Sequence, residues 1–103
     1  MFEKPFDVVV DADLQDLIPP YLVRRREESE QLKQLLSEGR HDEIKEIVHK
    51  LSGNAGGYGF TDLGEIAADI ESECMKNEVD NKKLSDLMNA LANYALNVRV
   101  TYE

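Results

Sequence analysis

One histidine faces outward on a predicted helix and is followed by glycines at helical spacing. At about 100° per residue, the apolar residues of this segment fall within roughly 60° of one another, whereas His49 falls at about 140°. Gly53 and Gly56 lie on the same outer side as the histidine. Lys45 lies one turn before it and Ser52 lies at the border. The predicted exposed strip therefore contains Lys45, His49, Ser52, Gly53 and Gly56.

The glycines of this strip weaken a helix and need a compensating role. Glycine inside a helix costs about 1 kcal/mol relative to alanine, so Gly53, Gly56 and Gly57 together would cost about 3 kcal/mol. That is a sizeable share of a small domain's stability. Helical side chains lean toward the N-terminus, so a side chain at position 53 would cover His49. Glycine there is expected to leave the imidazole open to another surface.

An uncovered imidazole is suited to nucleophilic chemistry. Near neutral pH much of a free imidazole is uncharged and has one unprotonated ring nitrogen. That nitrogen can attack an activated phosphorus and form a covalent intermediate. Phosphoryl transfer depends mostly on alignment and charge neutralisation, so a carrier can be simple if its partner supplies the metal and catalytic groups. Most surface histidines are only solvated, but the glycines on the same side favour a function for His49.

Apolar residues at helical spacing predict the elements that position this histidine. We expect a short N-terminal helix before Pro19 and Pro20, because proline is tolerated only in a first turn, and then a longer helix ending near Glu38. Further helices are predicted over residues 41–58, over residues 61 to about 76, and from Asp80 or Asn81 to the end. The predicted fold is all-α, an antiparallel up-down four-helix bundle with a short N-terminal helix.

Three smaller features of the sequence refine the predicted fold. Thr61 is expected to be the N-cap of the third helix. Residues 8–10 are all valine, but they stand alone, so no sheet is expected. Arg25, Glu28 and Ser29 fall on the inward side of the first long helix. Either that helix overhangs the bundle there, or these groups border the functional face.

Composition limits the classes of function. The chain has 103 residues, which fits a single domain over residues 1–103. Its net charge of −9 argues against nucleic-acid and membrane partners. One cysteine, Cys74, excludes an internal disulfide and a thiolate-rich metal site. No apolar run approaches the ~20 residues of a membrane span, and residues 1–5 lack a signal-peptide core, so a cytoplasmic location is expected.

The run from His49 to Gly59 resembles the signature of histidine phosphotransfer (HPt) domains. In that pattern an apolar residue follows the histidine by two positions, a glycine by four and a second glycine by ten. Leu51, Gly53 and Gly59 match these places, and Ala55 matches a small residue between them. Only this stretch is specific, although weaker similarity extends over most of the chain.

The resemblance implies a four-helix bundle with a phosphorylatable histidine on its second helix. His49 would exchange a phosphoryl group with receiver-domain aspartates in a multistep two-component relay. The expected partners are receiver domains and a hybrid sensor kinase, and the expected state is a monomer. No kinase activity and no cofactor are expected, and the sequence has no glycine-rich phosphate loop or nucleotide fingerprint.

The chain departs from the family pattern beside the histidine. Many family members carry lysine three residues after it, where this chain has Ser52, which brings no charge. Lys50 is adjacent in sequence but points to a different face. Lys45 is the better candidate for charge compensation, and an arginine of the preceding helix is an alternative. The expected binding residues are Lys45, Lys50, Ser52, Gly53 and Gly56, and the candidate arginines are Arg24, Arg25 and Arg26.

Two other functions stay open at the level of sequence. The first is a non-catalytic interaction module that docks a partner helix in the glycine-lined groove, with His49 as a contact residue. The second is a metal-binding bundle, because Glu46 and His49 have the Glu-x-x-His spacing of carboxylate-bridged sites, as do Glu38 and His41. Such sites face a bundle interior, whereas Glu46 and His49 face outward, so we expect no metal.

Overall fold

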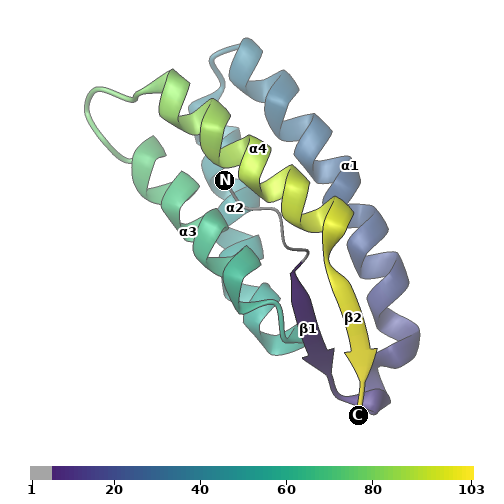
Figure 1. Cartoon of the computed structure of the whole chain (residues 1–103). Coiled ribbons are helices and arrows are strands. Elements are labelled where there is room, and N and C mark those ends of the chain that lie inside the picture. Colours follow the sequence, from purple (N-terminus) through teal and green to yellow (C-terminus); the bar gives the residue numbers. More distant parts are fainter. Residues whose placement is uncertain (1–5) are drawn as a thin grey trace.

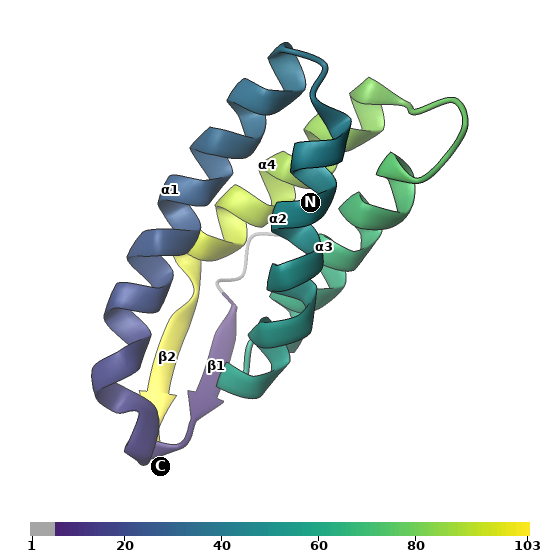
Figure 2. The same ribbon diagram turned by 180° about the vertical axis from the view of Figure 1, so that it is seen from behind.

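The computed structural model describes residues 6–103 of the chain. Residues 1–5, where no signal peptide is expected, lie outside this range. Four helices pack together, and in Figures 1 and 2 each helix runs back alongside the one before it. This confirms the predicted helical bundle. In chain order the elements are β1 (Asp7–Val10), the 3₁₀ helix η1 (Ala12–Leu17), α1 (Ile18–Ser37), α2 (His41–Asn54), the 3₁₀ helix η2 (Ala55–Tyr58), α3 (Thr61–Cys74), α4 (Asn81–Asn97) and β2 (Arg99–Tyr102).

The core is built from the apolar stripes that the sequence predicts. On α2 the side chains of Ile44, Val48 and Leu51 are buried, and Ala55 continues the same face at the start of η2. Leu32 of α1 is also fully buried, and so are leucines and isoleucines of α3 and α4. Because this face of α2 is fixed in the core, the opposite face must point to solvent.

Helix α1 starts and stops as its proline and glycine residues predict. Pro19 and Pro20 lie in the first turn, where a missing N–H costs no helical hydrogen bond. Gly39 follows the helix with a φ of 69°, a left-handed conformation that glycine adopts without strain.

The start of α3 differs from the prediction. Thr61 is the first residue of the helix, the N-cap position is held by Phe60, and no side chain caps the helix. The expected N-cap role of Thr61 is therefore wrong. The Phe60 ring is fully buried, so core packing rather than capping determines which residue precedes the helix.

The predicted helix over residues 41–58 changes type along its length. The α-helix ends at Asn54, and the chain continues as η2 to Tyr58. Gly59 then has a φ of 95°, and its N–H donates to the Gly56 carbonyl at 3.0 Å. The tighter 3₁₀ helix and the left-handed backbone conformation of Gly59 redirect the chain toward α3. Gly56 therefore lies just beyond α2 rather than in it.

A small parallel sheet joins the two ends of the described chain. Asp7 lies opposite Arg99 and Val10 lies opposite Tyr102. The expectations that the valines of residues 8–10 stand alone and that the last helix reaches the chain end are both wrong. The helix ends at Asn97 because Val98 adopts an extended conformation, and a strand follows. Figure 1 shows β1 and β2 side by side at one end of the bundle.

The sheet closes the end of the bundle where α2 passes into η2. A Cβ added at Gly59 would lie 3.4 Å from Val10 Cγ2 and 3.5 Å from the Val9 carbonyl oxygen, so η2 comes close to β1. The rings of Tyr21 and Tyr58 lie 4.4 Å apart beside this contact. Among residues 6–103, no helix combines the length and the apolar character that crossing a bilayer requires.

Candidate functional site

His49 lies in the middle of α2 on the face that points away from the core. Its side chain is 73 % exposed, whereas the neighbouring Val48 is fully buried. The exposure expected from the helical periodicity is thus confirmed. An imidazole in this position is accessible to the surface of another protein.

Glu71 of α3 holds one nitrogen of this ring. His49 Nδ1 lies 2.7 Å from Glu71 Oε2, and the Glu71 side chain is 22 % exposed. A carboxylate accepts hydrogen bonds and does not donate them, so Nδ1 carries the proton and is the donor. In the neutral ring this leaves Nε2 with its lone pair free. The contact therefore selects which nitrogen can act as a nucleophile.

Sequence analysis did not identify Glu71 as a site residue. The antiparallel pairing of α2 and α3 could have revealed this contact, because the chain reverses direction around Phe60. His49 lies eleven residues before Phe60 and Glu71 lies eleven residues after it, so the two face each other across the helix pair. Periodicity within one helix does not reveal such a contact, because it depends on the position of the turn.

The predicted glycines Gly53 and Gly56 lie beside open space. A Cβ added at Gly53 or Gly56 would meet no atom within 4 Å. Packing within the domain therefore does not require glycine at either position. At Gly64 of α3, by contrast, a Cβ would lie 3.6 Å from Ala55 Cβ, where α2 and α3 approach closely.

Ser52 uses its hydroxyl inside its own helix. The hydroxyl donates to the His49 carbonyl oxygen at 2.9 Å. This is the local side chain-to-backbone contact that serine commonly makes in helices. In this conformation Ser52 does not direct its hydroxyl at the imidazole.

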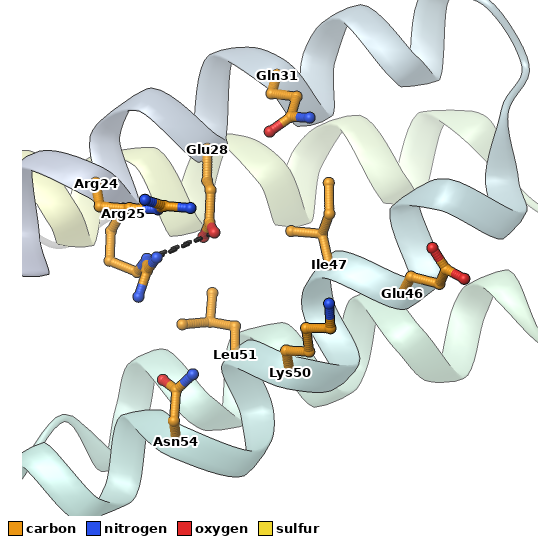
Figure 3. A pocket seen from close by; sticks show the side chains of 9 residues that line it. All are labelled: Arg24, Arg25, Glu28, Gln31, Glu46, Ile47, Lys50, Leu51 and Asn54. Atoms are coloured by element: carbon orange, nitrogen blue, oxygen red, sulfur yellow. Dashed lines mark hydrogen bonds and ion pairs between the residues drawn. The ribbon is translucent and has the colours of Figure 1, made fainter.

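The two predicted lysines lie on different sides of α2. Lys45 was expected on the exposed strip but is half-buried toward α3. There burial raises the pKa of the Cys74 thiol, and the charge of Lys45 opposes this rise. Lys50 instead lines a groove between α1 and α2 together with Arg24 and Arg25 (Figure 3). Among the described residues, neither lysine forms a hydrogen bond or an ion pair.

Two of the inward polar residues of α1, Arg25 and Glu28, border this groove, whereas Ser29 donates its hydroxyl to the Arg26 carbonyl oxygen. The side chains of Arg25 and Ser29 are almost fully buried, and Glu28 lines the groove beside Arg25. Because Arg25 and Ser29 are buried, α1 does not overhang the bundle at these residues. That the hollow beside Arg25 and Glu28 belongs to the functional face stays a prediction.

The described residues contain no ready-made metal site. Within residues 6–103, no three side chains among the histidines, cysteines, aspartates and glutamates are grouped so that they can hold an ion. His41 Nε2 instead lies 2.9 Å from Asn81 Oδ1, in a contact that joins the starts of α2 and α4.

Fold and site together define a helical-bundle protein that presents one solvent-facing histidine. The family model of the Hpt domain matches residues 21–99, and the chain belongs to this family. The match runs from α1 to the first residue of β2, so β1 lies outside it. No curated protein and no solved structure matches the chain. Hpt domains are phosphocarriers in two-component signalling that work with receiver domains and kinases.

Proposed function

We propose that this domain carries a phosphoryl group on Nε2 of His49 and exchanges it with aspartates of receiver domains. The observation that carries the proposal is an imidazole that is 73 % exposed and whose Nδ1 is bonded to Glu71. The ring is thus accessible, oriented and held in the tautomer that leaves Nε2 free. The proposed carrier is cytoplasmic and monomeric and has no kinase activity of its own. Its partners are receivers and kinases, as for other Hpt domains.

The transfer step is a displacement at phosphorus. The Nε2 lone pair attacks the phosphorus of an aspartyl phosphate, a nitrogen–phosphorus bond forms, and the aspartate leaves as a carboxylate. The proton on Nδ1 stays in place, so the phosphorylated ring carries positive charge. The carboxylate of Glu71 stabilises that charge. Transfer to the next receiver reverses the same bonds.

Charge compensation for the phosphoryl group is assigned to Lys45. It lies one helical turn before His49, has no ion-pair partner among the described residues, and is on the Glu71 side of α2. Lys50 lines the opposite groove. Gly53 and Gly56 are assigned the role of leaving room for the receiver.

The test is phosphoryl transfer from a panel of phosphorylated receiver domains. We expect acid-labile, alkali-stable phosphate on the wild type and on His41→Gln, but none on His49→Gln. His41 is the matched control because it is the other histidine of the chain. If no receiver of the panel transfers phosphate to the wild type, the carrier function is wrong. Binding of a receiver without transfer would then favour the interaction module.

A further inference from the structure

The basic side chains of this acidic protein are mostly neutralised by acidic neighbours. The chain has a net charge of −9. Within residues 6–103 the exceptions are Arg24, Lys45 and Lys50, which form no hydrogen bond or ion pair, and Arg26, which donates to the Ala95 carbonyl. The ion pairs of the others are Arg25–Glu28, Lys33–Glu30, Arg40–Glu38, Arg40–Glu43, Lys76–Glu73, Lys83–Glu73, Lys82–Asp86 and Arg99–Asp7.

Two of the unpaired cations line the groove between α1 and α2. This groove has a volume of about 250 Å³. Figure 3 shows Arg24 on the α1 side and Lys50 on the α2 side, with the apolar side chains of Ile47 and Leu51 between the helices. The carboxylate of Glu46, at the outer end, points away from the arginines. The groove thus presents the donors of Arg24 and Lys50 beside two apolar side chains, together with a Glu28 carboxylate that is paired with Arg25.

One wall of the groove is held rigid by bonds within the domain. Arg25 Nε lies 2.9 Å from Glu28 Oε1, and its guanidinium lies 4.5 Å from the centre of the Tyr21 ring. The Tyr21 hydroxyl donates to Asn54 Oδ1 at 2.7 Å. The amide NH₂ of Asn54 is therefore still available as a donor on the floor of the groove. Arg25 supplies the wall, whereas Arg24, Lys50 and Asn54 have donors free for a ligand.

We propose that this groove binds a carboxylate side chain on the receiver that exchanges phosphate with His49. The inference rests on the proposed function. A protein surface that holds an acceptor aspartate and its magnesium ion is rich in carboxylates, so its rim complements Arg24 and Lys50. A guanidinium matches the two oxygens of a carboxylate. The groove is smaller than the roughly 300–1,000 Å³ of small-molecule pockets, which favours one side chain over a free cofactor.

Because of its position, the groove also affects which receivers the domain accepts. Lys50 follows His49 directly in α2, so a receiver anchored on Lys50 and Arg24 is oriented next to the reacting ring. The groove lies on the side of α2 opposite Glu71, so docking leaves the Nδ1 contact undisturbed. Receivers without an acidic residue at this place are then poorer partners.

The experiment measures receiver binding separately from chemistry. Arg24→Glu/Lys50→Glu is made in the His49→Gln background, and calorimetry measures the Kd for a receiver of the panel that binds the wild type. We expect the Kd to rise about tenfold or more and to depend less on salt concentration. Lys33→Glu/Lys82→Glu is the control, because it makes the same change in net charge at lysines that are paired elsewhere. The control should change Kd by less than threefold.

The same variants with His49 intact show whether the groove affects KM or kcat of phosphoryl transfer. For Arg24→Glu/Lys50→Glu we expect the loss to fall mainly on KM for the receiver. Equal Kd values for the groove and control variants would overturn the docking site, and so would a loss confined to kcat. Arg24→Gln/Lys50→Gln should give an intermediate Kd if charge is the cause. Groove-dependent binding without any phosphate transfer would retain the docking site and reject the carrier function.

Discussion

One contact orients the ring of His49, the hydrogen bond from Nδ1 to Glu71. Sequence reasoning identified the histidine because helical periodicity places it outside the core and glycines follow it at helical spacing. It did not identify Glu71, because that contact depends on how two helices are paired across a turn.

Replacing Glu71 by glutamine should slow phosphorylation of His49. The amide can still accept from Nδ1 but brings no negative charge to the phosphorylated ring. We expect a loss of roughly threefold to tenfold in the rate of transfer, which is modest because the imidazole is largely exposed. The control is Glu65→Gln, at an exposed position of the same helix. Nitrogen NMR of His49 should show the proton on Nδ1 in the wild type. A proton on Nε2 would contradict the assigned role of Glu71.

Replacing Lys45 by alanine should shorten the life of the phosphohistidine. The positive charge near the phosphoryl group is lost, so we expect hydrolysis to accelerate about twofold to fivefold, as suits a partly screened charge. Lys50→Ala should leave the hydrolysis rate nearly unchanged and affect receiver binding instead. Decay of the labelled protein after removal of the receiver measures this directly. Equal half-lives for the two variants would mean that Lys45 is not the compensating cation.

The elements show where local sequence patterns predict structure and where they do not. The four helices follow from apolar periodicity, and the end of α1 follows from Gly39. The sheet was missed because Asp7 pairs with Arg99 across nearly the whole chain, and no local pattern encodes such a partner. The 3₁₀ turn after Asn54 was not predicted, because glycines at positions 56 and 57 are compatible both with the end of a helix and with its continuation.

The glycine of α2 should be dispensable for folding but not for transfer. A methyl group at position 53 meets open space, so Gly53→Ala should stabilise the domain by up to about 1 kcal/mol through helix propensity. Gly53→Leu should slow transfer, because a bulky side chain on the histidine's face obstructs the receiver. Urea unfolding and transfer rates measure the two effects. Transfer by Gly53→Leu at the wild-type rate would refute the steric role of Gly53.

Gly59 should behave in the opposite way. Its φ of 95° is unfavourable for any residue with a Cβ, and Val10 lies beside it. Gly59→Ala is expected to destabilise the domain by about 1–2 kcal/mol. The control Gly57→Ala lies two residues earlier in open space and should not lower stability. If both substitutions gave the same urea midpoint, the close approach of η2 to β1 would be in doubt.

Across the bundle, a buried carboxylate holds the connection between α3 and α4. Glu73 is 1 % exposed, accepts the Asp80 N–H at 2.9 Å and pairs with Lys76 at 2.9 Å. These two contacts hold the pKa of Glu73 below its ordinary value of 4.5. Sequence analysis did not predict this anchor, because Glu73 falls beside the apolar stripe of α3 and its partners come from the following loop and helix.

The lowered pKa of Glu73 predicts a loss of stability in acid. The contribution of this group is fully present above the unfolded-state pKa, near 4.5, and disappears as pH falls through the lower pKa of the folded state. Urea unfolding between pH 7 and pH 3 should therefore show a steeper decline for the wild type than for Glu73→Gln. Parallel declines would contradict the role of Glu73, since the other carboxylates are shared by both proteins.

The most direct test of the phosphoryl carrier is to locate the phosphate within the imidazole. The protein is labelled with nitrogen-15, phosphorylated by a receiver domain and studied by phosphorus and nitrogen NMR. We predict one phosphorus bonded to Nε2 of His49, with the proton retained on Nδ1 beside Glu71. Phosphate on Nδ1, on His41 or on no histidine would contradict the claim that an exposed, Glu71-oriented His49 carries the phosphoryl group.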